Sequence, residues 1–390
     1  MMDKTIKLFY ENVLETRFTA TVLSCERDKA GYKVVLDRTL FYPEGGGQPA
    51  DKGSLDDAAV NDAREKDGLI YHYTDRPFEP GQTVSGQVDW ERRAAFMRNH
   101  TGEHIVSGIL SSRFGLSNVG FHMGAGFTTI DTSAPISKED LKTVELIANK
   151  AVRDNIGVLT EFPDGDGLRT MDFRSKLPEN ALIGGEIRVV TVPGYDACAC
   201  CGLHYFTTGA VGIIKLVDSQ KYKAGTRIYM LCGEDALKDY AAKNEAVYGI
   251  SVLLSAQPDK VFPAVQALIA EKSSLEQRII GYKNRLFASA AEAVPEGSPY
   301  YCHFEEGLSP DDMKRLATLI AERAGIAAVF SGTEGMYKYA LYSKNGVSDA
   351  ASALNAAFNG KGGMREALAQ GAVIGTESAI KAFFVKGFVN

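Results

Sequence analysis

The chain has 390 residues, of which 45% are hydrophobic and 24% are charged, and its formal net charge at pH 7 is -6. This composition is ordinary for a folded globular protein, and the length favours two to four domains. The net negative charge argues against a protein that binds long nucleic acid over a uniformly basic surface, but it is compatible with a local basic face.

The N-terminus and the cysteines indicate the compartment. Residues 1–7 contain no apolar core and no small-residue cleavage site, so we expect no signal peptide. No run approaches the roughly 20 apolar residues that a membrane helix needs. The six cysteines are spaced irregularly, which argues against a disulfide scaffold and favours a reducing environment. We therefore expect a cytoplasmic protein.

Residues 1–90 are predicted to form a small β-barrel. Phe18, Ala20 and Val22 alternate with polar residues, which places them on one face of a strand. His72 lies within another such strand and is expected to be structural. The predicted strands, separated by turn signals, cover residues 17–23, 32–37, 69–73 and 83–88.

A glycine-rich loop interrupts these strands. Gly45, Gly46 and Gly47 allow the backbone to approach another surface closely and to expose its N–H donors. The bulky Phe41 and the rigid Pro49 bracket the loop. A flexible hairpin and an ordered loop beside a site both remain open.

A helix that begins near Asp89 carries two histidines one turn apart. His100 and His104 are at positions i and i+4, which lie on the same helical face and suit a shared metal ion. Glu103 lies between them and is a candidate proton acceptor. It points about 100° away from His104 around the helix, so a solvated position or a supporting role beside the ligands is equally open.

Three arginines lie in the same helix. Arg92, Arg93 and Arg98 form either a solvated basic face or a surface that contacts phosphate, which arginine matches bidentately. A capping pattern at Ser137 then predicts a second amphipathic helix that ends near Asn155. With a strand at 188–192 and further strands at 211–217 and 226–230, residues 91–232 are expected to form one α+β domain.

The strand at 188–192 leads to a cysteine-rich turn that ends at His204. Zinc prefers four nitrogen and sulfur ligands in tetrahedral geometry. His100, His104, Cys200 and His204 could supply them, with Cys198 and Cys201 as rival sulfurs. Such a mixed set does not by itself distinguish a structural ion from a catalytic one.

The histidine pair also satisfies the H-x-x-E-H pattern of inverzincin proteases. Those enzymes need a carboxylate as third ligand, whereas this chain offers a cysteine–histidine turn. A metalloprotease is therefore retained as an alternative.

Residues 233–294 are predicted to be helical. Apolar residues recur at a and d positions from Val261 to Leu286, interrupted by Lys272. This seam either packs on the helix at 234–254 or forms a homodimer through the helix at 258–287. Two prolines and a glycine at 295–299 end the segment.

Residues 295–390 are expected to form a small α/β domain. Strands are predicted at 327–330 and 337–342, and helices at 310–324 and 349–358. A glycine-rich turn at 360–365 carries Lys361 and Arg365, and either contacts phosphate or is a flexible turn.

Several motifs, in the same order, resemble one family: the long form of the AlaX proteins, free-standing relatives of the editing and C-terminal domains of alanyl-tRNA synthetase. The likeness is strong over about residues 1–235 and weak beyond. The C-terminal glycine run lacks the proline of the family pattern. The motifs are at residues 36–48 (LDRTLFYPEGGGQ), 97–104 (MRNHTGEH), 196–204 (DACACCGLH), 207–212 (TTGAVG) and 227–229 (RIY).

The resemblance implies a multidomain α+β fold and a zinc-dependent hydrolase that removes serine, or glycine, from mischarged tRNA(Ala) in trans. It implies zinc ligation by His100, His104, Cys200 and His204. A full synthetase carries an aminoacylation domain ahead of this region, so we do not expect tRNA charging. A tRNA-binding protein with a purely structural zinc is the alternative from another functional class.

The resemblance also suggests contacts with the substrate. Thr39 and Gln48 are expected to face the acyl-adenosine end of the tRNA, and His122 is expected to line the acyl pocket. The remaining candidates from the motifs are Glu103 as a catalytic group and Gly45, Gly46, Gly47, Arg92, Arg93 and Arg98 as substrate contacts.

Overall fold

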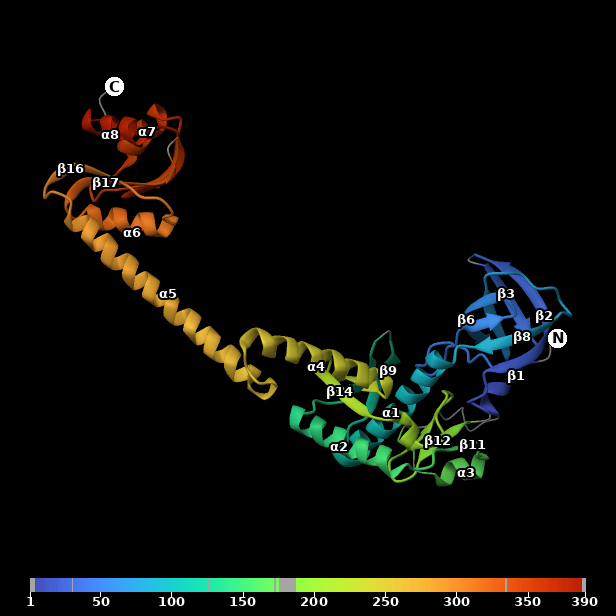
Figure 1. Cartoon of the computed structure of the whole chain (residues 1–390). Helices are drawn as coiled ribbons and strands as arrows, with labels where there is room; N and C mark the ends of the chain where they lie inside the picture. The colour runs from blue at the N-terminus through green and yellow to red at the C-terminus, as the bar shows by residue number, and fades with distance from the viewer. Residues whose placement is uncertain are drawn as a thin grey trace. The chain divides into compact units, whose positions relative to one another are not determined.

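The computed structural model describes residues 4–29, 31–124, 126–171, 173–174, 187–333 and 335–387. The chain divides into two compact units, Met1–Gly249 and Ile250–Asn390. Several sheets and helices occur in these units, which confirms the predicted multidomain α+β class (Figure 1). Among the described helices, none combines the length and the apolar character needed to cross a bilayer.

The first unit begins with a closed six-stranded barrel. Phe18, Ala20 and Val22 point into its core, as the alternation predicted. A short strand β1 (Ile6–Lys7) pairs in parallel with β4 (Arg38–Thr39) beside it. The barrel strands, in spatial order, are β2 (Arg17–Asp28), β3 (Gly31–Leu36), β7 (Leu69–Thr74), β6 (Ala58–Lys66), β5 (Gly53–Leu55) and β8 (Thr83–Val88).

Helix α1 (Trp90–Phe114) crosses the core of the first unit. The Asp89 side chain caps it by accepting the Arg92 N–H, as predicted. A Cβ at Gly102 would lie 2.5 Å from Cys232 Sγ, and one at Gly108 would lie 2.2 Å from the Tyr195 carbonyl oxygen. The two glycines therefore let neighbouring segments pack directly against the helix that carries the histidine pair.

Two sheets and a helix complete the surroundings of α1. Ser137 caps α2 (Lys138–Asp154), as predicted, and a short α3 (Gly165–Thr170) follows. The cysteine turn comes directly after the last strand of the smaller sheet. The four-stranded sheet is β14 (Ile214–Tyr222), β15 (Gly225–Cys232), β10 (Thr128–Thr132) and β9 (Asn118–Met123), and the three-stranded sheet is β11 (Leu159–Glu161), β12 (Val189–Val192) and β13 (Asp196–Ala199).

The second unit is a five-stranded sheet with helices on both faces (Figure 1). Helices α7 (Ser348–Ala357) and α8 (Glu377–Val385) pack on one face, and α6 (Pro310–Ile320) packs on the other with the end of α5 (Val261–Glu292). Helix α4 (Glu234–Leu254) begins in the first unit. The strand order is β16 (Ser298–Phe304), β17 (Ala324–Thr333), β18 (Met336–Tyr342), β20 (Leu368–Val373) and β19 (Lys361–Arg365).

The structure corrects one prediction in this unit. The glycine-rich segment expected to be a turn is the edge strand β19, which pairs with β20 and is exposed along its whole length. Glycines at 362 and 371 face each other in this ladder, where a Cβ at Gly362 would lie 2.5 Å from the Gln370 carbonyl oxygen. Close backbone pairing, rather than a turn, accounts for the glycines.

Candidate metal centre

Four side chains from two distant segments converge in the first unit. His100 and His104 come from α1, while Cys200 and His204 come from the turn after β13. Their ligand atoms all lie within 4.8 Å of one another. Cys200 Sγ is 3.4 Å from His100 Nε2 and 3.5 Å from His204 Nε2. Tetrahedral zinc would hold nitrogen and sulfur about 3.5 Å apart, so the donors are spaced for one such ion.

An oxygen atom lies beside the other ring nitrogen of each of the three imidazoles, which leaves Nε2 to face the centre; for His104 this is a close ion-pair contact without hydrogen-bond geometry. Partners of this kind fix the tautomer and the orientation of a ligating histidine. The Nδ1 contacts are His100 to Gln48 Oε1 at 3.1 Å, His104 to Asp196 Oδ2 at 2.8 Å and His204 to Thr101 Oγ1 at 3.4 Å.

The cysteine turn is shaped by a buried arginine and a glycine. Arg188 donates from its guanidinium to the carbonyl oxygens of Cys200 and Gly202, at 2.9 and 2.7 Å. A Cβ at Gly202 would lie 2.0 Å from His100 Cε1. Only glycine therefore lets the turn approach the α1 histidine closely enough to present Cys200 and His204 together.

The electrostatics of the cluster favour the metal-binding form at Cys200 and His204. At His104 burial would lower the pKa of the imidazole, but its contacts with Asp196 and Cys200 hold that pKa well above its usual value. Burial alone would raise the pKa of the Cys200 thiol, but the surrounding imidazoles, His100 above all, hold that pKa well below its usual value. Burial, together with the neighbouring His100 and His104, keeps the pKa of His204 well below its usual value. A thiolate and a neutral imidazole are the protonation states that metal ligation requires.

The glycine-rich loop is an ordered part of this centre. Gly46 and Gly47 have φ angles of +58° and +80°. Side chains there would lie 2.7 Å from Cys201 Sγ and 2.6 Å from the Phe121 ring. The alternative of a flexible hairpin is therefore wrong, because the loop packs against both the ligand turn and β9.

The same loop borders an open cavity of about 410 Å³. Exposed His122, on β9, lines it together with Gly45, Gly46, Gly47 and Arg64. The structure thus brings the predicted loop and His122 together on one surface. Gln48 also borders this cavity, and its Oε1 accepts hydrogen bonds from Leu203 N–H and from His100 Nδ1.

Thr39 and Arg93 lie elsewhere than predicted. Thr39 is completely buried, and its hydroxyl lies 2.8 Å from His72 Nε2, so the structure does not open it to a substrate. Arg93 is also completely buried, and its guanidinium pairs with Asp51 and donates to the Leu40 carbonyl. Arg93 therefore anchors α1 to the barrel and is not a phosphate contact.

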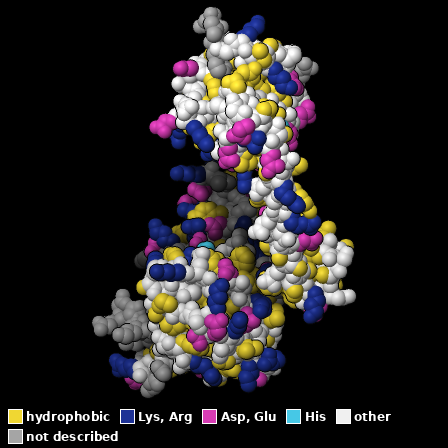
Figure 2. All heavy atoms as spheres, turned by 90° about the vertical axis from the view of Figure 1, so that its left-hand side faces the viewer, with side chains coloured by type: hydrophobic (Ala, Val, Ile, Leu, Met, Phe, Trp, Pro, Cys, Tyr) yellow, Lys and Arg dark blue, Asp and Glu magenta, His cyan; other side chains and the backbone are white. Residues whose placement is uncertain are grey.

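The other arginines are partly accessible. Arg98 pairs with Glu234 at 3.2 Å. Arg92 donates to the Ala50 carbonyl and lies 4.6 Å from the centre of the Phe96 ring. Figure 2 shows Lys and Arg interspersed with Asp and Glu over the face in view, with no single basic patch among its described side chains.

Glu103 is a buried carboxylate and not a solvated one. It accepts hydrogen bonds from Ser107 and Asn118, and its Oε2 lies 3.9 Å from His104 Nε2. The solvated position expected as one alternative for this residue is therefore wrong, while its roles as proton acceptor and as a supporting group beside a ligand stay predictions.

Sequence reasoning missed several residues that hold the ligands. Asp196 stands four residues before Cys200 in the same motif, so the sequence offered its carboxylate as a candidate partner for a ligand. No sequence pattern marks Thr101 or Arg188, because a threonine within a helix and an arginine before a strand are common. Arg174 also pairs with Asp196, at 2.8 Å, and nothing in its neighbourhood of the sequence indicates that.

Comparisons with known proteins agree with the motifs. The family model described as tRNA synthetases class II (A) matches residues 4–92. The model described as threonyl and alanyl tRNA synthetase second additional domain matches residues 187–229, which include Cys200 and His204.

Curated relatives include the alanine–tRNA ligase of Methanothrix thermoacetophila, 33% identical over 97% of this chain and 44% of the relative. The alanine–tRNA ligase of Natronomonas pharaonis is 32% identical over 85% of this chain and 38% of its own length. The chain thus spans less than half of these ligases. The alanyl-tRNA editing protein Aarsd1 of Mus musculus is 30% identical over 64% of each chain.

Among solved structures, the C-Ala domain of Aquifex aeolicus alanyl-tRNA synthetase aligns with 23% of this chain and 91% of its own, at 17% identity. The TM-score is 0.20, which is too low to establish a shared arrangement.

Proposed function

Since this chain is a relative of the alanyl-tRNA synthetases and the alanyl-tRNA editing proteins, as its motifs predicted, we propose that it is a zinc-dependent aminoacyl-tRNA hydrolase. Its substrate is tRNA(Ala) wrongly charged with serine, or with glycine. The observation that carries the proposal is the convergence of His100, His104, Cys200 and His204 beside the glycine-rich loop.

The chemistry suits an ester that is already reactive. When bound, a zinc ion supplies a positive charge that can polarise a carbonyl or activate water. The chain's own part is to place the ester. The cavity beside Gly45, Gly46 and Gly47 receives the acyl end, with His122 at its wall. Gln48 joins this cavity to the cluster through its hydrogen bond to His100.

The need for such a hydrolase follows from the limits of binding selectivity. An apolar pocket shaped for alanine cannot strongly exclude the hydroxyl of serine. A second site that tests the acyl group by hydrolysis supplies the missing discrimination. Arg92 and Arg98, which retain exposed surface near the start of α1, are proposed to contact tRNA phosphates.

A tRNA-binding protein with a structural ion is the second candidate. It is favoured by the closed character of the cluster, because four protein ligands are present and all three imidazoles are buried. Structural zinc sites have four protein ligands, whereas catalytic ones keep a position open. A metalloprotease fits less well, since the partner of the histidine pair is a cysteine–histidine turn and not a carboxylate.

Serine release from Ser-tRNA(Ala), with Ala-tRNA(Ala) as the control substrate, separates these candidates. We expect hydrolysis of the serine ester and sparing of the alanine ester. His100→Ala should abolish hydrolysis while the circular dichroism spectrum is retained. Tight tRNA binding without hydrolysis by the zinc-loaded protein would favour the structural candidate, and cleavage of unfolded polypeptide would favour the protease.

We further propose that α5 forms a homodimer. Leu268, Leu275 and Ile279 of the predicted seam are exposed in the single chain. Lys272 pairs with Glu276, which lies beside the seam on the same helix, so its charge is partly compensated. Light scattering should give twice the mass of the chain, and Leu275→Asp should give the monomer mass. A wild-type monomer at micromolar concentration would contradict this proposal.

A further inference from the structure

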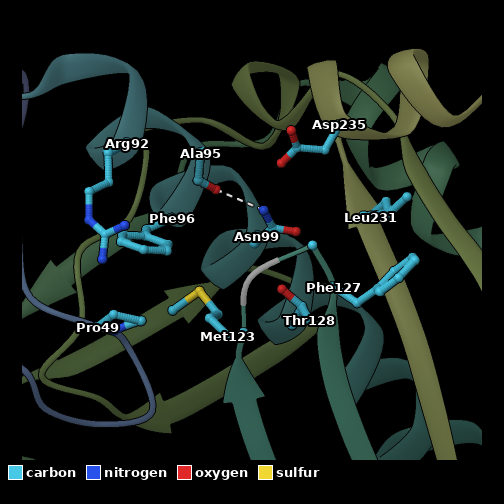
Figure 3. Close-up of a pocket in the computed structure, with 12 residues that line it drawn as sticks. Pro49, Arg92, Ala95, Phe96, Asn99, Met123, Phe127, Thr128, Leu231 and Asp235 are labelled. Atoms are coloured by element: carbon cyan, nitrogen blue, oxygen red, sulfur yellow. Dashed lines mark hydrogen bonds between the residues drawn. The ribbon is translucent and has the colours of Figure 1, made fainter.

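A second cavity, of about 390 Å³, lies in the first unit and is lined by none of the four candidate ligands (Figure 3). Its walls come from α1, from the segment joining β9 to β10, from the end of β15 and from the start of α4. Such a volume suits a small organic group and exceeds what one water molecule needs.

One buried polar group in this cavity has an unused hydrogen-bonding atom. Asn99 is 8% exposed, and its Nδ2 donates to the Ala95 carbonyl oxygen at 2.9 Å. Its Oδ1 is buried and finds no hydrogen-bond partner among the described residues. The Ala95 carbonyl can only accept, which fixes the amide with its nitrogen toward Ala95. Figure 3 shows the Asn99 oxygen turned away from Ala95 and toward the other lining side chains.

The free-energy penalty of burying Asn99 Oδ1 without a hydrogen bond indicates that a donor is missing from the cavity. A buried acceptor without a partner destabilises the folded state, and a ligand N–H would remove the penalty. An amide nitrogen carries two hydrogens, of which Ala95 takes one. Asn99 can therefore accept one hydrogen bond from a ligand and donate another to it.

The remaining walls are largely apolar, with Arg92, Thr128 and Asp235 as their polar members. Phe96 and Phe127 lie on opposite sides of Asn99 in Figure 3, with Met123 below it. Phe127 is 45% exposed, so its ring can contact a ligand. The Arg92 guanidinium lies 4.6 Å from the centre of the Phe96 ring and adds a charged edge.

We propose that this cavity binds the adenine of the tRNA 3′-terminal adenosine, the nucleoside that carries the acyl group. An asparagine amide matches adenine bidentately, accepting from its 6-amino group and donating to N7. Unpaired bases are commonly held by stacking on aromatic rings or on arginine. Guanine would present an oxygen to Asn99 Oδ1, so the same amide disfavours it. The inference rests on the proposed function.

Three sequence neighbours connect this cavity with the metal centre. Asn99 precedes His100, Pro49 follows Gln48, and Met123 follows His122. Asn99, Pro49 and Met123 line this cavity. Their neighbours belong to the candidate metal centre, as His100 does, or border its open cavity, as Gln48 and His122 do. A base bound here therefore lies next to the elements that receive the ester.

The test removes the 6-amino group from the terminal adenine of the tRNA. Uncharged tRNA(Ala) ending in adenosine is compared with the same tRNA ending in purine riboside, which lacks the 6-amino group. The full-length protein should bind the adenosine end about tenfold more tightly, the range expected for a specific base contact. Asn99→Leu should bind both ends equally, and Asn244→Leu, at an exposed asparagine on α4, should keep the preference.

Two further measurements separate this inference from the proposed function. Equal binding of both ends by the wild-type protein, with serine release intact, overturns the adenine subsite and leaves the hydrolase. A clear preference for adenosine without any serine release supports the subsite and overturns the hydrolase. If Asn99→Leu fails to fold, Phe127→Ala, at a half-exposed ring, should weaken binding of both ends, and unchanged binding would contradict the stacking contact.

Discussion

Replacing Gln48 by leucine tests how the glycine-rich loop supports the metal centre. Gln48 is fully buried, and its Oε1 accepts hydrogen bonds from Leu203 N–H at 2.9 Å and from His100 Nδ1 at 3.1 Å. Leucine has a similar volume but accepts neither bond. The change therefore leaves one buried backbone donor unpaired and frees the His100 ring to rotate.

The magnitude follows from these two losses. An unpaired buried donor costs about 1–3 kcal/mol of folding free energy. Loss of the group that orients a metal-bound histidine typically weakens metal binding by about 10- to 100-fold. We expect Gln48→Leu to show both effects, whereas Gln48→Glu, which retains acceptor oxygens, should keep more of the metal affinity.

The assay is zinc competition against a chromophoric chelator, combined with urea unfolding. Gln266→Leu, at an exposed glutamine on α5, is the matched control and should leave both quantities unchanged. Wild-type zinc affinity in Gln48→Leu would contradict this prediction, because it would show that the His100 ring needs no support from the loop.

Three other predictions follow from particular contacts. Burial lowers the pKa of His72 to about 4, below its unfolded value of about 6.5. The unfolded chain then binds the proton first, so this residue should reduce the unfolding free energy by up to about 3 kcal/mol as pH falls from about 6.5 to about 4. Urea unfolding should show a shallower pH dependence in His72→Gln than in wild type, and an identical slope would contradict the buried neutral ring. Asp51→Ala should cost about 3–5 kcal/mol because it leaves Arg93 buried without its partner, whereas Asp57→Ala, at an exposed aspartate, should cost much less, and comparable losses would contradict the buried pair. Gly202→Ala should abolish high-affinity zinc binding because its Cβ would overlap His100, while Gly249→Ala, with no neighbour within 4 Å, should not. Metal content of the purified variants checks this.

The ligand cluster was predictable because each half is encoded locally. The four-residue spacing of His100 and His104 places both on one helical face, and Cys200 and His204 belong to one short turn. The ligand preference of zinc for four nitrogen and sulfur atoms then joined the halves, and the family resemblance implied the same four residues. The caps at Asp89 and Ser137 were predictable for a similar reason, since a capping side chain bonds within its own first turn.

What periodicity could not reveal is which surface covers a given side chain. Arg93 lies on the same helix as Arg92, yet its partner Asp51 is 42 residues away. Strand β6 contains Asp62, Arg64 and Glu65, whose charges conceal its pairing in the barrel. The unpaired oxygen of Asn99 likewise depends on where the chain places β9, β15 and α4, and no local pattern encodes that.

X-ray absorption spectroscopy of the zinc-loaded protein tests whether His100, His104, Cys200 and His204 bind one zinc ion. We expect one zinc per chain, bound by three nitrogens at about 2.0 Å and one sulfur at about 2.3 Å, with the sulfur lost in Cys200→Ala. A spectrum with two or more sulfurs, or an unchanged spectrum in Cys200→Ala, would contradict it.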